Sequence, residues 1–265
     1  MTNTRELVEL VEGSPKAVAV HDRDAWLSLF TSDAEVNDPV GSAPHVGVAS
    51  IGPFYDTFIG PNTISFDVDR DIVCGMTIVR DLHVTTVMST GATLKVPMHL
   101  RYVAERTDGN LKIARLYAHW ELPSMITQLM LAGSKGLLAS AKLTPQLVSN
   151  LGPSGAVGFM RGFVRVSRHG KKSATRFLSA VQQGRVDLAE GLLADDAVLE
   201  YPLGAAVTPA QFVELAGSVT WSKVICAGRF VTASIESEVE AGVILFEFGP
   251  RGRKIEAVQM LTNRK

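Results

Sequence analysis

Apolar and polar positions along the first 120 residues follow two different periods. Residues 25–30 (AWLSLF) carry apolar side chains at helical spacing, and Asp22 or Asp24 can cap the start of this helix. Residues 48–59 (VASIGPFYDTFI) predict a second helix, interrupted or capped near Gly52 and Pro53. Later stretches rich in β-branched residues alternate with period two, which predicts strands at 63–74, 77–90, 94–106 and 111–122. Helices followed by an antiparallel sheet are typical of an α+β domain.

The pattern of the first part returns later in the chain. LFTSDAEVNDPVG (29–41) matches LLADDAVLEYPLG (192–204) at a constant offset of 163 residues. DIVCG (71–75) resembles KVICA (223–227) at an offset of 152, so the second copy is 163 − 152 = 11 residues shorter between these points. The missing part falls in the region of the second helix. Because order and spacing both agree, the sequence predicts a tandem duplication; chance similarity of short apolar strings is the alternative.

The segment between the two copies has a different composition. Residues 121–176 hold eight basic residues and the single acid Glu121, a local balance of 8 − 1 = +7, although the whole chain carries −1. Their pattern is helical, with interruptions at Gly133, Gly136 and Pro145. Two interpretations stay open: a linker that packs its apolar stripe on the domains, and a basic surface that makes weak contact with an anionic membrane. The predicted domains are 1–122, a helical basic connector at 123–172, and 173–265.

Composition narrows the classes of function. A hydrophobic content of 46% and a charged content of 20% fit a globular protein with apolar cores. The small net charge and the absence of a recognised motif argue against a nucleic-acid partner, and the six histidines lack metal-ligand spacing, so neither metal nor cofactor is expected. Cys74 and Cys226 fit buried apolar positions in a reduced compartment. With a polar N-terminus and no long apolar run, we expect a cytoplasmic protein.

Asp38 begins the tetrapeptide DPVG (38–41), for which two interpretations compete. Aspartate, proline and glycine form a turn for local reasons, since aspartate accepts backbone hydrogen bonds and glycine tolerates positive φ. The aligned YPLG of the second copy keeps the proline and the glycine but has Tyr201 in place of the acid. In that copy the turn does not require aspartate. This comparison favours a chemical role for Asp38.

Residues 33–58 (DAEVNDPVGSAPHVGVASIGPFYDTF) resemble the bacterial ketosteroid isomerases of the SnoaL-like, nuclear-transport-factor-2-like superfamily. The residues that carry the resemblance are Asp38, Pro39, Gly41, Phe54 and Tyr55, and it extends over about 15–122 and more faintly over 173–265. It implies two tandem cone-shaped domains, each a curved antiparallel sheet packed on N-terminal helices around an apolar pocket. The implied activity is that of a steroid delta-isomerase, with Asp38 as the general base acting on a steroid or polycyclic ketone.

The resemblance weakens at the groups that would stabilise the enolate oxygen. The family uses a tyrosine on the first helix and an acid on a later strand; here Ser14 falls at the tyrosine's gap-free position. In VPMHLRY (96–102) either Met98 or His99 stands at the acid's place, and strand alternation favours Met98 inward, on the face of Leu100 and Tyr102. The resemblance and the strand faces together nominate as substrate-binding residues Phe54, Tyr55, Met98, His99, Tyr117, His119 and Trp120, of which Tyr55, Tyr117 and His119 are replacement donors.

The second copy lacks these groups. Tyr201 replaces the base, and the strand acid's position falls on Ile244. It is interpreted as a degenerate, structural domain that pairs with the first as a pseudo-dimer within one chain, and homo-oligomers are a further expectation. The alternative to an enzyme is a non-catalytic binding protein for an apolar small molecule, or a structural partner acting at a membrane surface.

Overall fold

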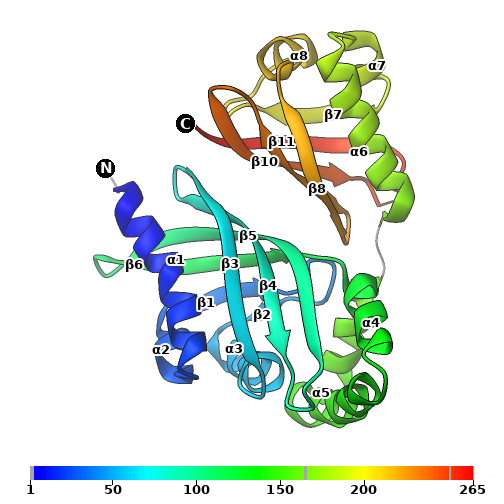
Figure 1. The fold of residues 1–265 in the computed structure, drawn as a ribbon. Helices are drawn as coiled ribbons and strands as arrows, with labels where there is room; N and C mark the ends of the chain where they lie inside the picture. The colour runs from blue at the N-terminus through cyan, green and yellow to red at the C-terminus, as the bar shows by residue number, and fades with distance from the viewer. Residues whose placement is uncertain (1–2, 164–165, 251, 265) are drawn as a thin grey trace. The chain divides into compact units, whose positions relative to one another are not determined.

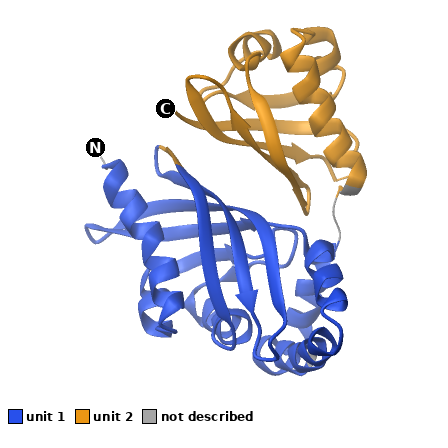
Figure 2. Ribbon diagram, viewed as in Figure 1, with its two compact units in different colours: residues 1–71, 75–164 blue, residues 72–74, 165–265 orange. Residues whose placement is uncertain are grey.

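The computed structural model describes residues 3–163, 166–250 and 252–264; Arg165 of the basic connector lies outside these ranges. The chain divides into two compact units, residues 1–71 with 75–164, and residues 72–74 with 165–265 (Figure 2). The helices at 122–163 belong to the first unit. The domain limits expected from the sequence remain a prediction, but most of the expected connector is grouped with the first domain. No helix among the described residues is long and apolar enough to span a membrane.

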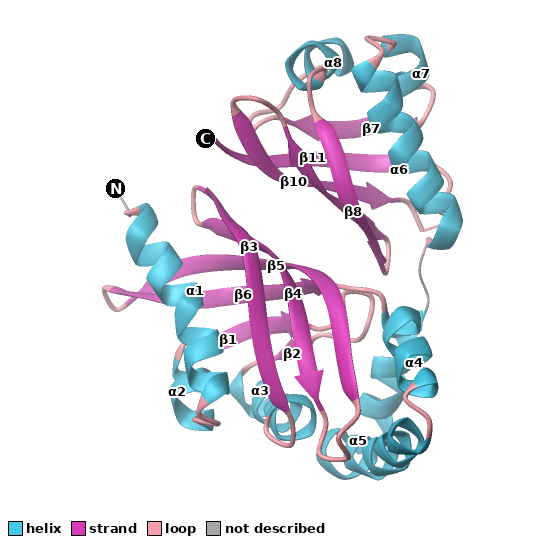
Figure 3. Ribbon diagram, in the orientation of Figure 1, coloured by secondary structure: helices cyan, strands magenta, loops and turns pink. Residues whose placement is uncertain are grey.

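The first unit combines helices with a six-stranded sheet of order β2-β1-β6-β5-β4-β3 (Figures 1 and 3). Two further helices follow the last strand. Its elements are α1 (Thr4–Ala19), α2 (Arg23–Ser28), β1 (Phe30–Asn37), β2 (His45–Val46), α3 (Val48–Phe54), the π-helical turn η1 (Tyr55–Ile59), β3 (Thr63–Cys74), β4 (Thr77–Val87), β5 (Thr93–Thr107), β6 (Asn110–His119), α4 (Leu122–Leu131), α5 (Ser134–Met160) and the 3-10 turn η2 (Arg161–Phe163).

The strands expected from alternation are present, with ends that shift by a few residues. The strands β3 to β6 are joined by short turns, and the pairs β4–β5 and β5–β6 are antiparallel. The pair β1–β6 is parallel, which the expectation of an antiparallel sheet did not include. Asp22 caps α2, since its side chain accepts a hydrogen bond of 2.9 Å from the Ala25 amide. The residue pattern alone did not predict α1, which contains Gly13 and Pro15, whereas the resemblance implied a first helix around Ser14.

Aromatic packing holds the helices of the first unit on its sheet, and a buried ion pair joins two of its strands. Trp26 is fully buried, with its ring centroid 4.7 Å from that of Phe30 and 5.3 Å from that of Tyr55. Under α1, the buried Arg80 of β4 donates to both carboxylate oxygens of Asp71 at 2.7 and 3.0 Å. A charge this deeply buried depends on its partner, because the fold has removed it from water.

The second unit repeats this topology. Its sheet has the order β7-β11-β10-β9-β8, and β7 pairs with β11 in parallel just as β1 pairs with β6. The duplication predicted from the offsets is therefore present in the backbone. Its elements are α6 (Ser167–Gln182), α7 (Val186–Glu190), β7 (Leu193–Glu200), α8 (Pro209–Ala216), β8 (Thr220–Ala227), β9 (Phe230–Glu236), β10 (Glu240–Phe248) and β11 (Ile255–Arg264).

One detail of the repeat differs from expectation. The second helix region was expected to be missing from the second copy, but α8 occupies that place between β7 and β8. The shortening is spread over three elements. Eight helical residues replace the seven of α3 and the five of η1, and the strand β2 is reduced to the isolated bridge between Glu200 and Ala206. The first long strand is also shorter, since β8 has eight residues where β3 has 12. The turn itself is retained, with φ of 101° at Gly41 and 87° at Gly204, values that favour glycine.

The interior of the second unit is filled by its own side chains. Phe177 lies with its ring centroid 5.7 Å from that of Phe212 and 5.6 Å from that of Phe246. The Tyr201 hydroxyl donates a hydrogen bond to Glu240 Oε1, and burial together with this bond raises the pKa of Tyr201. Ile244 and Cys226 are buried, whereas Cys74 of β3 is half-buried. Where the first unit has Asp38, the second therefore has a neutral aromatic side chain.

Candidate active site in the first unit

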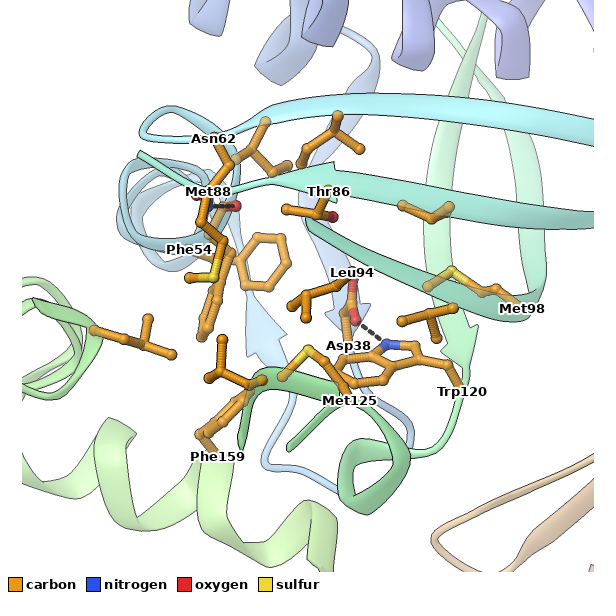
Figure 4. Close-up of a pocket in the computed structure, with 17 residues that line it drawn as sticks. Asp38, Phe54, Asn62, Thr86, Met88, Leu94, Met98, Trp120, Met125 and Phe159 are labelled. Carbon is orange, nitrogen blue, oxygen red and sulfur yellow. Dashed lines mark hydrogen bonds between the residues drawn. The ribbon is translucent and has the colours of Figure 1, made fainter. Parts of the chain in front are cut away.

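Asp38 and Trp120 meet because two parallel strands end side by side. In the β1–β6 register Asn37 lies opposite Tyr117, so the residues that follow each strand emerge at the same edge of the sheet. The Trp120 indole Nε1 donates a hydrogen bond of 2.6 Å to Asp38 Oδ1 (Figure 4). The strand pairing thus delivers a carboxylate and a neutral donor to one point.

The turn after β1 is held by Asn37 and Ser42. The Asn37 amide nitrogen donates to the Ser42 carbonyl at 3.0 Å, and its side-chain oxygen accepts from the Gly41 amide at 3.2 Å. Ser42 Oγ donates to the Pro39 carbonyl at 2.7 Å. These bonds make the local contacts that the turn interpretation assigned to Asp38. The Asp38 side chain is directed instead toward Trp120 and the cavity.

The cavity beside Asp38 is almost entirely apolar (Figure 4). Asp38 is the only ionisable residue among the described residues that line it, and the other polar side chains are Asn62, Thr86 and the indole of Trp120. Helices α4 and α5 close one side of it, and the residues they supply are Met125, Leu129, Leu143 and Phe159. An apolar chamber with one carboxylate fits an apolar ligand with few polar groups.

The environment changes the acidity of Asp38. Burial raises the pKa of its carboxyl from 3.8 to about 6, and the hydrogen bond from Trp120 opposes that rise. The residue is half-buried because its side chain opens into the cavity while protein surrounds it on the other sides. A carboxylate that titrates near pH 6 is ionised at neutral pH and is more basic than an exposed aspartate.

A second compartment continues from the first and shares Asp38, Phe54 and Met98 with it. Its lining adds Ser14 and Tyr102. Burial raises the pKa of Tyr102 to about 12, so its phenol is neutral and can donate a hydrogen bond; the charge of Arg80 and a hydrogen bond with Ser14 act in the opposite direction.

Ser14 is itself oriented by a neighbour. The Trp26 indole donates to Ser14 Oγ at 3.0 Å, inside the buried region of the first unit. Trp26, Ser14 and Tyr102 therefore form a chain of neutral polar groups that ends in this compartment, which Asp38 also borders.

Three of the seven residues nominated for substrate binding line the cavity with Asp38, namely Phe54, Met98 and Trp120. His99 follows Met98 on β5 and points to the other face of the sheet, where its Nε2 lies 3.4 Å from Asp81 Oδ1. Tyr117 and His119 share that face, since they lie opposite Arg101 and His99 in the β5–β6 register.

The contacts of these residues explain why they are absent from the lining. The Arg101 guanidinium lies 4.5 Å from the Tyr117 ring centroid. Burial, together with the positive charge of Arg101, lowers the pKa of His119 well below its usual range. Tyr55 is buried against Trp26, and its hydroxyl has no hydrogen-bond partner among the described residues. It does not border either compartment.

Two groups at the site were missed at the level of sequence. Tyr102 was placed on the inward face of its strand by alternation, but no polar role was assigned to it. For α4 and α5 the sequence predicts a connector, with packing of its apolar stripe on the domains as one interpretation, but it does not place these residues on the cavity. The strongest missed signal was Tyr102, a tyrosine in line with Met98 and Leu100.

Part of the first unit is similar to known proteins. Residues 11–116 match the model of the SnoaL-like domain. Among solved structures, the chain is similar to the Δ5-3-ketosteroid isomerase from a Mycobacterium species, at 27% identity over 45% of this chain and 96% of that one, with a TM-score of 0.42.

Two other solved structures are similar at lower identity. A Mycobacterium tuberculosis protein in complex with estradiol-17β-hemisuccinate matches at 23% identity over 45% of this chain and 96% of its own, with a TM-score of 0.41. A putative SnoaL-like polyketide cyclase from Shewanella putrefaciens matches at 12% identity over 49% and 99%, with a TM-score of 0.43. The match at residues 11–116 shows that this part of the first unit is similar to the SnoaL-like domain.

Proposed function

We propose that the first unit is a ketosteroid-isomerase-like enzyme that moves a carbon–carbon double bond in a steroid or another polycyclic ketone. One observation carries the proposal: Asp38 is the only ionisable group on an apolar cavity, among the described residues, and its pKa is raised to about 6. Desolvation of this kind converts a weak base into one suited to proton transfer near neutral pH.

The proposed reaction is an internal proton transfer. The Asp38 carboxylate takes a proton from the carbon between the ketone and the isolated double bond, and the electron pair of that C–H bond moves into a dienolate. The protonated Asp38 then gives the same proton to the carbon two positions along, which forms the conjugated ketone. No proton or electron is gained or lost overall, so the reaction requires no cofactor. Trp120 keeps the Asp38 carboxyl oriented between the two carbons through its hydrogen bond.

The negative charge of the dienolate oxygen needs a donor, and we propose Tyr102 for this role. Its neutral phenol borders the compartment that Asp38 also lines, and Ser14, oriented by Trp26, supports it. A neutral donor in an apolar compartment stabilises a developing oxyanion strongly, because little water competes for it. The donor would then lie on β5, four residues after Met98. Met98 stands at the position where the resemblance expects the family's acid.

The second candidate function is binding without turnover. It is favoured by Met98, an apolar side chain that lines the cavity at the position where the resemblance expects an acid. In that case the cavity holds an apolar small molecule and Asp38 binds its hydroxyl group. The two candidates differ in whether a bound β,γ-unsaturated ketone is converted.

The test is incubation with a β,γ-unsaturated ketosteroid while the absorbance of the conjugated product is followed. We expect turnover that falls by about 100- to 10,000-fold in Asp38→Asn, the range for loss of a general base. Tyr102→Phe should lower kcat by about 100-fold, as for loss of one oxyanion donor. Tyr117→Phe is the matched control, because it removes a hydroxyl from the opposite face of the sheet. Steroid-induced thermal stabilisation without turnover would leave only the binding function.

The remaining proposals concern the rest of the chain. We propose that the second unit is structural, since Tyr201 and its partner Glu240 occupy the place of the base. A pseudo-dimer of the two units, homo-oligomers and a cytoplasmic location are proposals of the same kind. Loss of isomerase activity on Tyr201→Phe, with the fold intact, would argue against a purely structural second unit.

A further inference from the structure

Exposed apolar side chains are concentrated on the helices that follow the first sheet. Of the 17 large hydrophobic residues that are exposed among the described residues, 8 lie between residues 122 and 163. That segment is 42 of the 265 residues of the chain. Scattered exposed apolar residues are ordinary on a folded protein, but a concentration of this kind indicates a surface that another phase or molecule covers.

The most exposed of them surround the turn between α4 and α5, here called the α4–α5 tip (residues 130–142). Gly133 makes this turn with a φ of 62°. The exposed fractions are 77% for Met130, 81% for Leu131, 74% for Leu137 and 57% for Leu138. These four side chains do not contribute to the core. The inward face of the same helices is formed by Leu129 and Ala139, which pack on the β4–β5 turn.

The charge of the tip has one sign. Lys135 and Lys142 are exposed there, and residues 122–163 contain no aspartate or glutamate. Neither lysine forms an ion pair with a described residue. Two unpaired cations beside four exposed apolar side chains match a surface that is negatively charged outside and apolar just beneath.

We propose that the α4–α5 tip docks on an anionic lipid bilayer, with its four apolar side chains among the upper acyl chains and its two lysines at the phosphates. The tip is a convex turn carrying flexible Met and Leu side chains, which suits a fluid interface better than the rigid pocket of a protein partner. Helices α4 and α5 also line the cavity through Met125 and Leu143. Docking therefore brings the wall of the cavity to the place where apolar ligands accumulate.

The test is co-sedimentation of the full chain with phosphatidylcholine vesicles that contain or lack phosphatidylglycerol. We expect binding only to the anionic vesicles, weakened by added salt. Lys135→Ala with Lys142→Ala should reduce the partition coefficient about 25-fold, at about fivefold for each lysine near a charged bilayer. Leu131→Glu with Leu137→Glu should reduce it at least as much, since both side chains leave the acyl region. Val20→Glu is the matched control, because Val20 is 72% exposed at the end of α1, away from the tip.

Several outcomes would overturn the proposal. Absence of binding to anionic vesicles, or an equal loss of binding in Val20→Glu, excludes the tip as a lipid-docking surface. Light scattering that shows a dimer dissociated by Leu131→Glu with Leu137→Glu, without vesicle binding, assigns the tip to a second copy of this chain. Thermal unfolding of each variant is measured as a control for an intact fold. Isomerase activity in free solution is a separate measurement, so failure here leaves the proposed function standing.

Discussion

Replacing Asp38 by asparagine should make the protein more stable at neutral pH while it removes the proposed base. The reason is the raised pKa of the Asp38 carboxyl, from 3.8 to about 6. The folded protein binds this proton more tightly than the unfolded chain does. Stability from this group is therefore greatest below pH 3.8, falls as the pH rises toward 6, and stays at its lower level above that value. The asparagine side chain of the Asp38→Asn variant has no charge to desolvate at any of these pH values.

The size of the effect follows from the two pKa values. Ionised Asp38 lowers the free energy of unfolding by less than about 1 kcal/mol at pH 4, by about 2 kcal/mol at pH 5 and by about 3 kcal/mol at pH 7.5. These are upper limits, because water that enters the cavity reduces the cost of burying the charge. The amide introduced by Asp38→Asn adds a penalty of its own, but that penalty is the same at every pH. The change between pH 4 and pH 7.5, about 2 kcal/mol, is thus the quantity that tests the reasoning.

The assay is urea unfolding of wild type and Asp38→Asn in parallel at several pH values, followed by tryptophan fluorescence. Two of the three tryptophans, Trp26 and Trp120, lie in the first unit, so the signal reports mainly on that unit. The free energy of unfolding of Asp38→Asn, relative to that of wild type, should increase steadily from pH 4 to pH 7. A stability difference that is constant over this range would show that Asp38 is not desolvated in the folded state, and a difference of opposite slope would show that its pKa is lowered.

Two further predictions follow from the same contacts. Trp120→Phe removes the hydrogen bond that stabilises the Asp38 carboxylate, so the pH at which isomerase kcat/KM reaches half its maximum should move upward from about 6; an unchanged or lowered midpoint in a pH–rate profile would exclude this role. Arg80→Ala removes the buried cation that pairs with the part-buried Asp71 carboxylate, and should destabilise the first unit by about 3–5 kcal/mol in urea unfolding; a loss below about 1 kcal/mol would mean that water solvates the pair.

The fold could be predicted from the sequence in most of its parts because its signals are local. Alternation in 63–74 identified β3 at its true limits, and the offset of 163 residues identified the repeat. Pairing direction is not local: nothing in residues 30–37 distinguishes a parallel from an antiparallel neighbour. The place of α4 and α5 could not be predicted either, since an amphipathic helix does not indicate which sheet covers its apolar face.

The candidate site was predicted unevenly for a related reason. The resemblance supplied Asp38, and alternation separated Met98 from His99, because both depend on short stretches of chain. The other polar groups of the site come from elsewhere in the chain. Trp120 follows the strand that lies parallel to β1, and Tyr102 borders the second compartment because β5 brings it against Ser14 of α1. Neighbours of this kind depend on register between strands and on helix packing, which the sequence pattern does not specify.

The two copies of the fold separate what the turn needs from what the chemistry needs. In the first unit the bonds that close the turn are made by Asn37 and Ser42, so Asp38 contributes little to its geometry. In the second unit the same turn carries Tyr201, whose hydroxyl has its own partner in Glu240. The scaffold therefore tolerates a neutral side chain at this position, whereas the first unit keeps a carboxylate there although burial raises its pKa. The space that Asp38 faces is the apolar cavity, which supports its proposed role as a base. This is why a pH-dependent gain in stability and a loss of turnover should appear together in Asp38→Asn.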